Sequence, residues 1–237
     1  MPLWDITAPL SPETPVYPGD EPVRFWKTAS IDRGDASNVS AFSMSVHAGT
    51  HVDAPSHLGF EGDADSIPLE VLTGACVVLD LSRAPECGGA PEAPFLIRLE
   101  DAGAELQRAT ATGPVVRLLL KTGRRPATGL DPELVRMLCE RGVRLIGLEL
   151  SSIDPETGPE AEMLPAHRAA LAAGTIVLEN LVLDGVPEGH YNLWALPTAL
   201  AGLEAAPVRA VLHGPLVTEH EAAELTDSNE SILSLKS

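Results

Sequence analysis

The sequence predicts an α/β fold, a compact single domain with a mixed, barrel-like β core flanked by helices. Short β-branched or apolar runs bounded by turn residues recur along the 237-residue chain and are typical of strands. Segments with helix-capping signals fall between these runs, and such alternation indicates an α/β protein. Because the strands are numerous and short, a mixed or barrel-like core is favoured over a regular doubly wound sheet.

The individual elements follow from local signals along the chain. The first 35 residues are rich in proline and acidic residues, which predicts irregular structure around one short strand. The clearest helix begins at Pro132, with Asp131 as its N-cap, and stops at Gly142. A second helix ends at Gly174. The expected strands are Ser40–His47, Cys76–Leu81, Val115–Leu120, Val143–Leu150, Thr175–Leu183, Tyr191–Leu196 and Val208–Leu212, and the expected helices are Pro68–Leu72, Arg98–Arg108, Pro132–Arg141, Leu164–Ala173 and Thr198–Leu203.

Composition bounds the organisation and the partners. With 44% hydrophobic residues, one domain is expected over residues 1–218, followed by a polar C-terminal tail over residues 219–237. A formal net charge of −18 would repel a nucleic-acid duplex or an anionic membrane, so neither is an expected partner. Cys76, Cys87 and Cys139 form no C-x-x-C pair, which argues against a disulfide framework and a cysteine-rich zinc site. The expected location is a reducing cytoplasm.

Four chemically active side chains fall within the segment H-A-G-T-H-V-D-A-P-S-H at residues 47–57. In an extended segment, His47, His51 and Asp53 point to one face. Full extension would place the Cα atoms of the two histidines roughly 13 Å apart, too far for comfortable sharing of one ion. We therefore expect a bend at Ala48-Gly49, because glycine permits one.

The residue types of this segment are those of metal ligands. Imidazole nitrogens and carboxylate oxygens suit zinc, manganese or iron. A single histidine is more often a hydrogen-bonded structural residue than a ligand. Three histidines and an aspartate together change this balance, since a core would have to satisfy four polar groups at once. A divalent metal site is the expected outcome.

The same segment resembles the signature H-x-G-[TA]-H-x-D-x-P-x-H of the putative cyclase superfamily, and within it the bacterial kynurenine formamidases. The likeness spans nearly everything up to about His213. Further segments similar to the family are L-W-D-I-T-A-P-L at 3–10, P-V-Y-P-G-D at 15–20, L-I-G-L-E-L-S-S-I-D at 145–154, E-N-L at 179–181, Y-N-L-W-A-L-P at 191–197 and A-P-V-R-A-V at 206–211.

The resemblance implies a site with two divalent metal ions, zinc foremost and manganese as the alternative. His47, His51 and Asp53 would bind the first ion, and Asp53 would bridge to the second. The family's remaining ligands are a helical histidine and a glutamate twelve positions later, a spacing that His167 and Glu179 match.

The resemblance also implies an activity and an assembly. His57 would be the catalytic acid/base, and Tyr17 would contact the aromatic ring of the substrate where the kynurenine formamidases carry a tryptophan. Glu149 stands where an aspartate is more usual. The implied protein is a homodimer in tryptophan catabolism that hydrolyses a small aromatic amide, N-formylkynurenine, to kynurenine and formate. The metal pair would lower the pKa of a bound water, and His57 would protonate the departing aniline nitrogen.

Three alternatives stay open. A related hydrolase would act on an isatin-like cyclic amide or on a lactone. An iron-dependent oxygenase would use a two-histidine, one-carboxylate triad of His51, Asp53 and either His167 or His213. A binding or regulatory module would hold a structural metal closed by four protein ligands. A serine-hydrolase mechanism is excluded, because the chain has no G-x-S-x-G motif.

Overall fold

Seven strands close into a barrel at the centre of the molecule. The computed structural model describes residues 2–82, 95–110, 113–123, 128–156 and 163–216, so the expected tail at 219–237 and Cys87 lie outside the described residues. Around the barrel, each strand pairs with the next in the order β12, β11, β5, β7, β9, β10, β4 and back to β12. These strands are β4 (His51–Asp53), β5 (Thr73–Asp80), β7 (Arg117–Lys121), β9 (Leu145–Leu148), β10 (Ile176–Glu179), β11 (Gly189–Pro197) and β12 (Ala205–Leu216).

The barrel mixes both strand directions. Strands β5, β7, β9 and β10 run parallel to one another. Strands β4, β11 and β12 complete the ring through antiparallel pairs. A short strand β1 (Leu3–Asp5) pairs with the C-terminal half of β12, at residues 211–213. The mixed, barrel-like core predicted from the sequence is confirmed.

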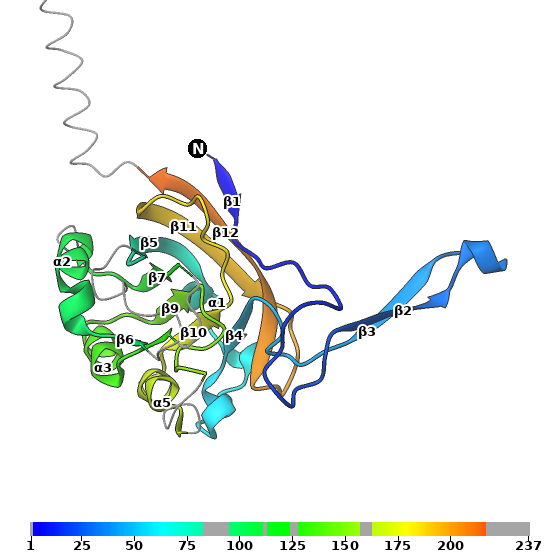
Figure 1. The fold of residues 1–237 in the computed structure, drawn as a ribbon, viewed down its shortest axis with the longest axis horizontal. Helices are drawn as coiled ribbons and strands as arrows, with labels where there is room; N and C mark the ends of the chain where they lie inside the picture. The colour runs from blue at the N-terminus through cyan, green and yellow to red at the C-terminus, as the bar shows by residue number, and fades with distance from the viewer. Residues whose placement is uncertain (1, 83–94, 111–112, 124–127, 157–162, 217–237) are drawn as a thin grey trace, which may run out of the picture.

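The two faces of the barrel wall carry separate hydrophobic clusters. One cluster contains residues of all seven strands, among them Val52 and Leu178, and fills the barrel. The other joins alternate residues of the parallel strands, such as Val177, to residues of the helices, which lie on that side in Figure 1. Successive side chains of a strand point to opposite faces. Because Val52 points into the barrel, His51 and Asp53 point outward, to the face that the helices cover.

Four of the five expected helices are confirmed. The side chain of Asp131 caps its helix as predicted, since it accepts a hydrogen bond from the backbone N–H of Glu133 at 2.8 Å. No helix among the described residues is long and apolar enough to cross a membrane. The helices are α1 (Leu69–Leu72), α2 (Leu99–Thr110), α3 (Pro132–Glu140) and α5 (Pro165–Ala172), and short 3-10 helices cover Ile31–Arg33, Pro55–Leu58 and Ala64–Ser66.

The helix expected over Thr198–Leu203 is wrong. These residues form the irregular connection between β11 and β12, which pair directly beside it at Pro197 and Val208. The N–H of Thr198 donates to the carbonyl of Pro207 at 3.0 Å, so the backbone is bonded across the turn rather than along a helix. Antiparallel neighbours joined by so few residues leave room only for a loop.

The N-terminal region contains more strand than predicted. Besides β1, it holds β2 (Arg24–Ala29), which pairs with β3 (Val39–Ser43) in a hairpin separate from the barrel. Figure 1 shows this hairpin extending away from the barrel. The strand expected over Ser40–His47 therefore ends early, and a turn follows it. Strands β4, β6 (Phe95–Ile97) and β8 (Thr128–Leu130) were not expected, because three residues are too few to show an alternation.

Candidate metal centre

Strand β4 and its partner β10 supply three of the candidate ligands. The register of this antiparallel pair places Glu179 directly opposite His51 and Val177 opposite Asp53. Cross-strand partners share one face of a sheet. The side chains of His51, Asp53 and Glu179 therefore point together to the outer face of the barrel, where all three are buried.

The chain bends just before β4, and the bend brings a fourth ligand candidate, His47, close to the other three. Gly49 has a φ of +68°, in the left-handed region that glycine adopts readily. The N–H of Ala48 donates to the carbonyl of Ser45 at 3.1 Å and closes the turn. As a result, the rings of His47 and His51 lie 5.0 Å apart, centroid to centroid. The bend predicted at Ala48-Gly49 is confirmed.

Helix α5 supplies His167, and Asp154 fixes its position. The carboxylate of Asp154 accepts hydrogen bonds from the backbone N–H groups of Ala166 (2.8 Å) and His167 (3.0 Å) in the first turn of α5. The same carboxylate lies 2.8 Å from Nδ1 of His167. Nε2 of the ring is left facing β4 and β10.

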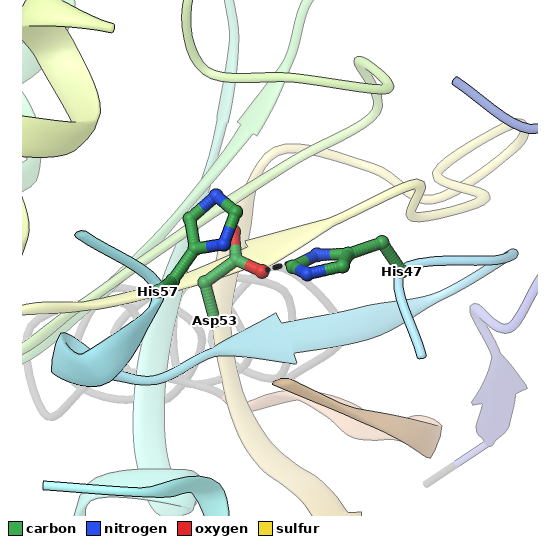
Figure 2. Close-up of side chains that lie close together, drawn as sticks. All are labelled: His47, Asp53 and His57. Carbon is green, nitrogen blue, oxygen red and sulfur yellow. Dashed lines mark ion pairs between the residues drawn. The ribbon is translucent and has the colours of Figure 1, made fainter. Parts of the chain in front are cut away.

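Asp53 lies at the centre of these side chains. Its Oδ1 is 2.9 Å from Nδ1 of His47 and 3.3 Å from Nε2 of His51. Its Oδ2 is 3.3 Å from Nε2 of His167. Glu179 lies 3.5 Å from His51 through Oε2 and 3.2 Å from His167 through Oε1. All five side chains that the sequence suggested as metal ligands therefore converge, and Figure 2 shows His47 meeting Asp53.

This donor set fits a divalent metal ion. Nε2 of His51 and Oδ1 of Asp53 are buried, and although they lie close to oppositely charged neighbours, neither atom has a partner with hydrogen-bond geometry. Nδ1 of His51 lies 2.9 Å from the carbonyl of Gly49 and donates to it, so Nε2 is the nitrogen that can offer a lone pair to a cation once the ring is neutral. Leaving a buried polar atom unsatisfied costs about 1–3 kcal/mol, and a cation would remove that cost for both atoms. Ligand atoms within 4.8 Å of one another form two groups, His51–Asp53–Glu179 and His47–Asp53–His57.

The ionisation of the metal-free site follows from its carboxylates. Burial disfavours a charged imidazole, but the negative charges of Asp53 and Glu179 outweigh it and raise the pKa of His51 to about 9. Burial acts the same way on His167, yet the neighbouring carboxylates, Glu179 foremost, raise the pKa of His167 well above its usual value. Burial would raise the pKa of Asp53, but the histidines around it hold that pKa well below the usual range. The site therefore attracts cations, protons included.

His57 lies beside the ligand candidates on a short helix of its own. The 3-10 helix Pro55–Leu58 carries it, and Figure 2 shows its ring beside the carboxylate of Asp53. The ring centroid is 4.6 Å from that of His47 and 5.5 Å from that of His167. Burial lowers the pKa of His57, against the opposing charge of Asp53. The ring is therefore neutral at pH 7 and can accept a proton.

A cavity of about 1150 Å³ opens over this cluster. The N-terminal segment forms part of its wall and includes Tyr17, whose side chain is 53% exposed. Seven carboxylate residues, but no lysine or arginine, stand among the described residues that line it: Glu13, Asp20, Asp53, Glu149, Glu156, Glu179 and Glu204. The volume suits a small aromatic molecule.

Glu149, the residue noted as a departure from the family pattern, serves the backbone around the cavity. It is buried, and its two oxygens accept hydrogen bonds from the N–H groups of Thr122 and Gly123 (2.9 Å each) and of Leu183 (3.2 Å). A carboxylate bonded in this way joins the ends of β7 and β9 to the chain after β10. The longer glutamate at this position is therefore accommodated.

Three residues of the site were not found by sequence reasoning. Asp154 orients His167, and Oε1 of Glu204 lies 3.5 Å from Nε2 of His47. The hydroxyl of Thr50 donates to the carbonyl of Asn180 at 2.7 Å and joins the bend to the end of β10. These contacts join residues in different elements of the fold, 13 positions apart for Asp154 and His167 and 130 for Thr50 and Asn180, so no local spacing could have marked them.

The chain matches known proteins over most of its length. Residues 4–155 match the family model described as Putative cyclase. Isatin hydrolase A from Labrenzia aggregata, solved with benzyl benzoate, has 30% identity and a TM-score of 0.75, covering 91% of this chain and 94% of its own. A potential metal-dependent hydrolase with cyclase activity has 25% identity and a TM-score of 0.69 over 89% and 98% of the two chains. A protein from Bacillus stearothermophilus described as a predicted metal-dependent hydrolase has 26% identity and a TM-score of 0.68 over 89% and 97% of the two chains.

Proposed function

The chain belongs to the putative cyclase family, and from this premise we propose that it hydrolyses the amide bond of a small aromatic substrate at a centre of two divalent metal ions. Its fold is that of cyclase-family metal-dependent hydrolases. Zinc is the proposed metal and manganese the alternative, since both suit imidazole and carboxylate ligands.

One observation carries the proposal: the two oxygens of Asp53 face different ligand groups. Oδ1 faces His47 and His51, whereas Oδ2 faces His167. Glu179 lies beside both groups, with one oxygen near His51 and the other near His167. A carboxylate placed in this way is suited to bridge two cations, with His47 and His51 on one side and His167 on the other.

The remaining chemistry falls to His57. A divalent metal ion bound at this centre acts as a Lewis acid that lowers the pKa of water and polarises a carbonyl oxygen. A neutral ring nitrogen of His57 can take a proton from the attacking water and deliver it to the departing aniline nitrogen. That nitrogen is a poor leaving group without the proton. The lowered pKa of His57 keeps the ring ready to accept it at neutral pH.

The cavity supports a neutral aromatic substrate. The exposed ring of Tyr17 in its wall can stack on an aniline ring. The described lining residues carry no lysine or arginine to pair with anionic groups. An uncharged amide group is therefore the better fit at the reacting end, and the carboxylates that line the cavity repel an anionic product.

Two substrate classes compete for this site. The motifs at residues 15–20 and 47–57 resemble those of the kynurenine formamidases, which favours N-formylkynurenine. The similarity to an isatin hydrolase at 30% identity favours a cyclic amide of the isatin type. Both reactions break a bond between a carbonyl carbon and an aniline nitrogen, so the same residues serve either one.

The iron-oxygenase alternative gives a role to fewer of the clustered side chains than the two-metal hydrolase does. A triad of His51, Asp53 and His167 leaves Glu179 and His47 without a role, although both lie at the centre. His213, the other candidate for that triad, packs beside Trp194 on β11 and is not among the residues that line the cavity. A purely structural metal is disfavoured by the large cavity open to the ligands.

A reducing cytoplasm is the proposed location. Within the described residues, Cys76 and Cys139 are free thiols. Free thiols of this kind are usual in a reducing compartment.

The test is a turnover assay on metal-stripped protein reloaded with Zn²⁺, Mn²⁺ or Fe²⁺, with N-formylkynurenine and isatin assayed side by side. We expect hydrolysis of at least one of them by the zinc or manganese protein, with about two ions per chain and no need for oxygen. Asp53→Asn removes the charge of the proposed bridging carboxylate and should lose both metal and turnover. Activity only with ferrous iron and oxygen, or no turnover on either amide, would contradict the proposal.

A further inference from the structure

The connection between β1 and β2 forms one wall of the cavity, although no helix or strand gives it shape. We call this connection, residues 8–20, the strap, and Figure 1 shows it in dark blue. Most of its residues line the cavity, Tyr17 among them. Four are prolines, which have no backbone N–H to donate to a neighbouring strand. The position of Tyr17 therefore depends on individual contacts of the strap.

A tight turn fixes the backbone next to Tyr17. The N–H of Asp20 donates to the carbonyl of Tyr17 at 2.9 Å and closes the turn. Pro18 and Gly19 occupy its two central positions, and Gly19 has a φ of +101°. Proline followed by a glycine of positive φ is typical of a type II turn, which brings its first and last residues close together. A contact that holds Asp20 in place therefore also holds Tyr17.

The hydroxyl of Ser45 joins this turn to the proposed metal ligand His47. It donates to Oδ2 of Asp20 at 2.8 Å and accepts from the backbone N–H of His47 at 3.3 Å. The carbonyl of Ser45 accepts from the N–H of Ala48 in the turn that carries His47. Because a hydroxyl can donate and accept at once, one side chain connects a ligand candidate to the turn that holds Tyr17.

The hydroxyl of Thr50 holds the other end of the strap. It accepts from the backbone N–H of Ala8 at 2.8 Å and donates to the carbonyl of Asn180 at 2.7 Å. Thr50 is itself buried. The strap is therefore held near both of its ends by hydroxyls of residues 45–50, the segment that carries His47 and the bend before β4.

We propose that Ser45 and Thr50 are positioning residues that set the affinity of the site for the aromatic end of its substrate. The inference rests on the proposed function, in which Tyr17 stacks on that ring while the amide lies at the metal centre. Both hydroxyls tie the strap to the segment of His47, so Tyr17 is held in place relative to the proposed ligands. A wall that is already ordered spares the substrate the entropy cost of ordering it, which strengthens binding.

The first test separates substrate binding from the chemical step. In the zinc-loaded protein, Ser45→Ala and Thr50→Val should each raise KM for N-formylkynurenine or isatin by about 3–10-fold, the size of one lost hydrogen bond. The value of kcat should stay nearly unchanged. Ser45→Thr and Thr50→Ser keep a hydroxyl and should restore the original KM. Metal analysis of each sample ensures that the variants are compared at equal metal content.

Thr175→Val is the matched control for Thr50→Val. The hydroxyl of Thr175 is also buried and donates to a backbone carbonyl, that of Val143, at 2.9 Å. Thr175 precedes β10 and is not among the residues that line the cavity. Its replacement should destabilise the fold to a similar degree and leave KM unchanged.

The variant Tyr17→Ala shows whether the two hydroxyls act through the tyrosine. In that background, Ser45→Ala and Thr50→Val should raise KM no further, because the ring that they position is gone. An equal rise of KM with and without Tyr17 would overturn the proposal, since a purely structural role acts in both backgrounds.

Hydrogen exchange tests the anchoring of the strap without any substrate. Backbone amides of residues 8–20 should exchange faster in Ser45→Ala and Thr50→Val, and at the original rate in Thr175→Val. Unchanged exchange of the strap in both anchor variants would overturn the inference. Absence of turnover on both amides, with the expected change in exchange, would instead overturn the proposed hydrolase activity.

Discussion

Nδ1 of His167 donates its proton to Oδ2 of Asp154 at 2.8 Å, and this bond decides which ring nitrogen faces the metal centre. With Nδ1 held by Asp154, Nε2 is the nitrogen that faces Asp53 and Glu179, and it is the one that can bind a metal ion once its own proton is displaced. Asp154 also holds the first turn of α5 through two backbone N–H groups. The buried carboxylate of Asp154 therefore sets both the position and the tautomer of His167, although the two residues belong to different segments of the chain.

Replacement of Asp154 should weaken metal binding without removing a ligand. In Asp154→Asn the side chain beside Nδ1 of His167 is no longer negatively charged, so the imidazole ring is less basic and less firmly oriented. Loss of such a partner typically lowers metal affinity by about 10–100-fold. Metal titration of the stripped protein measures it. Asp101→Asn is the control, because Asp101 is also buried and also accepts from a backbone N–H, that of Arg98. Equal affinity in the two variants would contradict the assignment.

Replacement of His57 should separate proton transfer from metal binding. His57→Ala leaves the five proposed ligands intact, so the protein should keep its metal and lose turnover by about 10²–10⁴-fold. Metal analysis and steady-state assays on the same sample measure both. Because His57 also stands in the group with His47 and Asp53, the alternative outcome is informative. Loss of metal in parallel with turnover would make His57 a ligand instead of an acid/base.

Metal binding should release protons and weaken as the pH falls. In the metal-free site the pKa of His51 is raised to about 9, and that of His167 is raised as well. Both rings are therefore protonated at pH 7, and a metal ion must displace those protons. Affinity should rise with pH until about 9. Calorimetry in buffers of different ionisation enthalpy counts the protons, and a count of zero at pH 7 would contradict the prediction.

The same shifts predict that the stability of the metal-free protein depends on pH in a way that the stability of the metal-loaded protein does not. A histidine whose folded pKa is raised stabilises the fold fully below its usual value of 6.5, and this contribution of His51 is lost as the pH rises through about 9. His167 acts in the same direction. The midpoint of thermal unfolding in chelator should therefore fall between these pH values, whereas with metal it should not. Parallel curves with and without chelator would refute this.

The sequence alone predicted the part of the site whose residues lie close together along the chain. His47, His51 and Asp53 share a short segment, so their residue types and the glycine between them were enough to predict a bend and a cluster. His167 and Glu179 came only from the family resemblance, because the contact between them depends on how α5 packs beside β10. The structure brings them to Asp53, as that resemblance implied.

The unpredicted features depend on three-dimensional contacts. Asp154 precedes His167 by 13 positions across the α5 start, and although it ends the family-like segment at 145–154, that segment does not say what its carboxylate contacts. Strand β4 carries two ligand candidates but is three residues long, and only its pairing with β10 and β12 makes it a strand. The helix expected over Thr198–Leu203 failed for the same reason, since strand pairing on either side fixed the connection.

Gly49 should matter for the metal more than for the fold. Its φ of +68° strains any other residue, and an added Cβ would lie 2.7 Å from Cδ2 of Leu10. Leu10 is half-buried and can rotate away, so the stability loss of Gly49→Ala should be that of the backbone alone, about 1–2 kcal/mol. Gly174→Ala is the matched control, because Gly174 has a φ of +71° with open space around it.

The two glycine variants should differ in the site. The carbonyl of Gly49 accepts the Nδ1 proton of His51, and the bend at Gly49 carries His47 back toward Asp53. A change in this backbone moves both rings, whereas Gly174 follows α5 at its far end from the site. Denaturant unfolding should therefore give similar losses for the two variants, and metal titration should show weaker binding for Gly49→Ala alone. If the two bind metal equally well, the bend does not position the ligands.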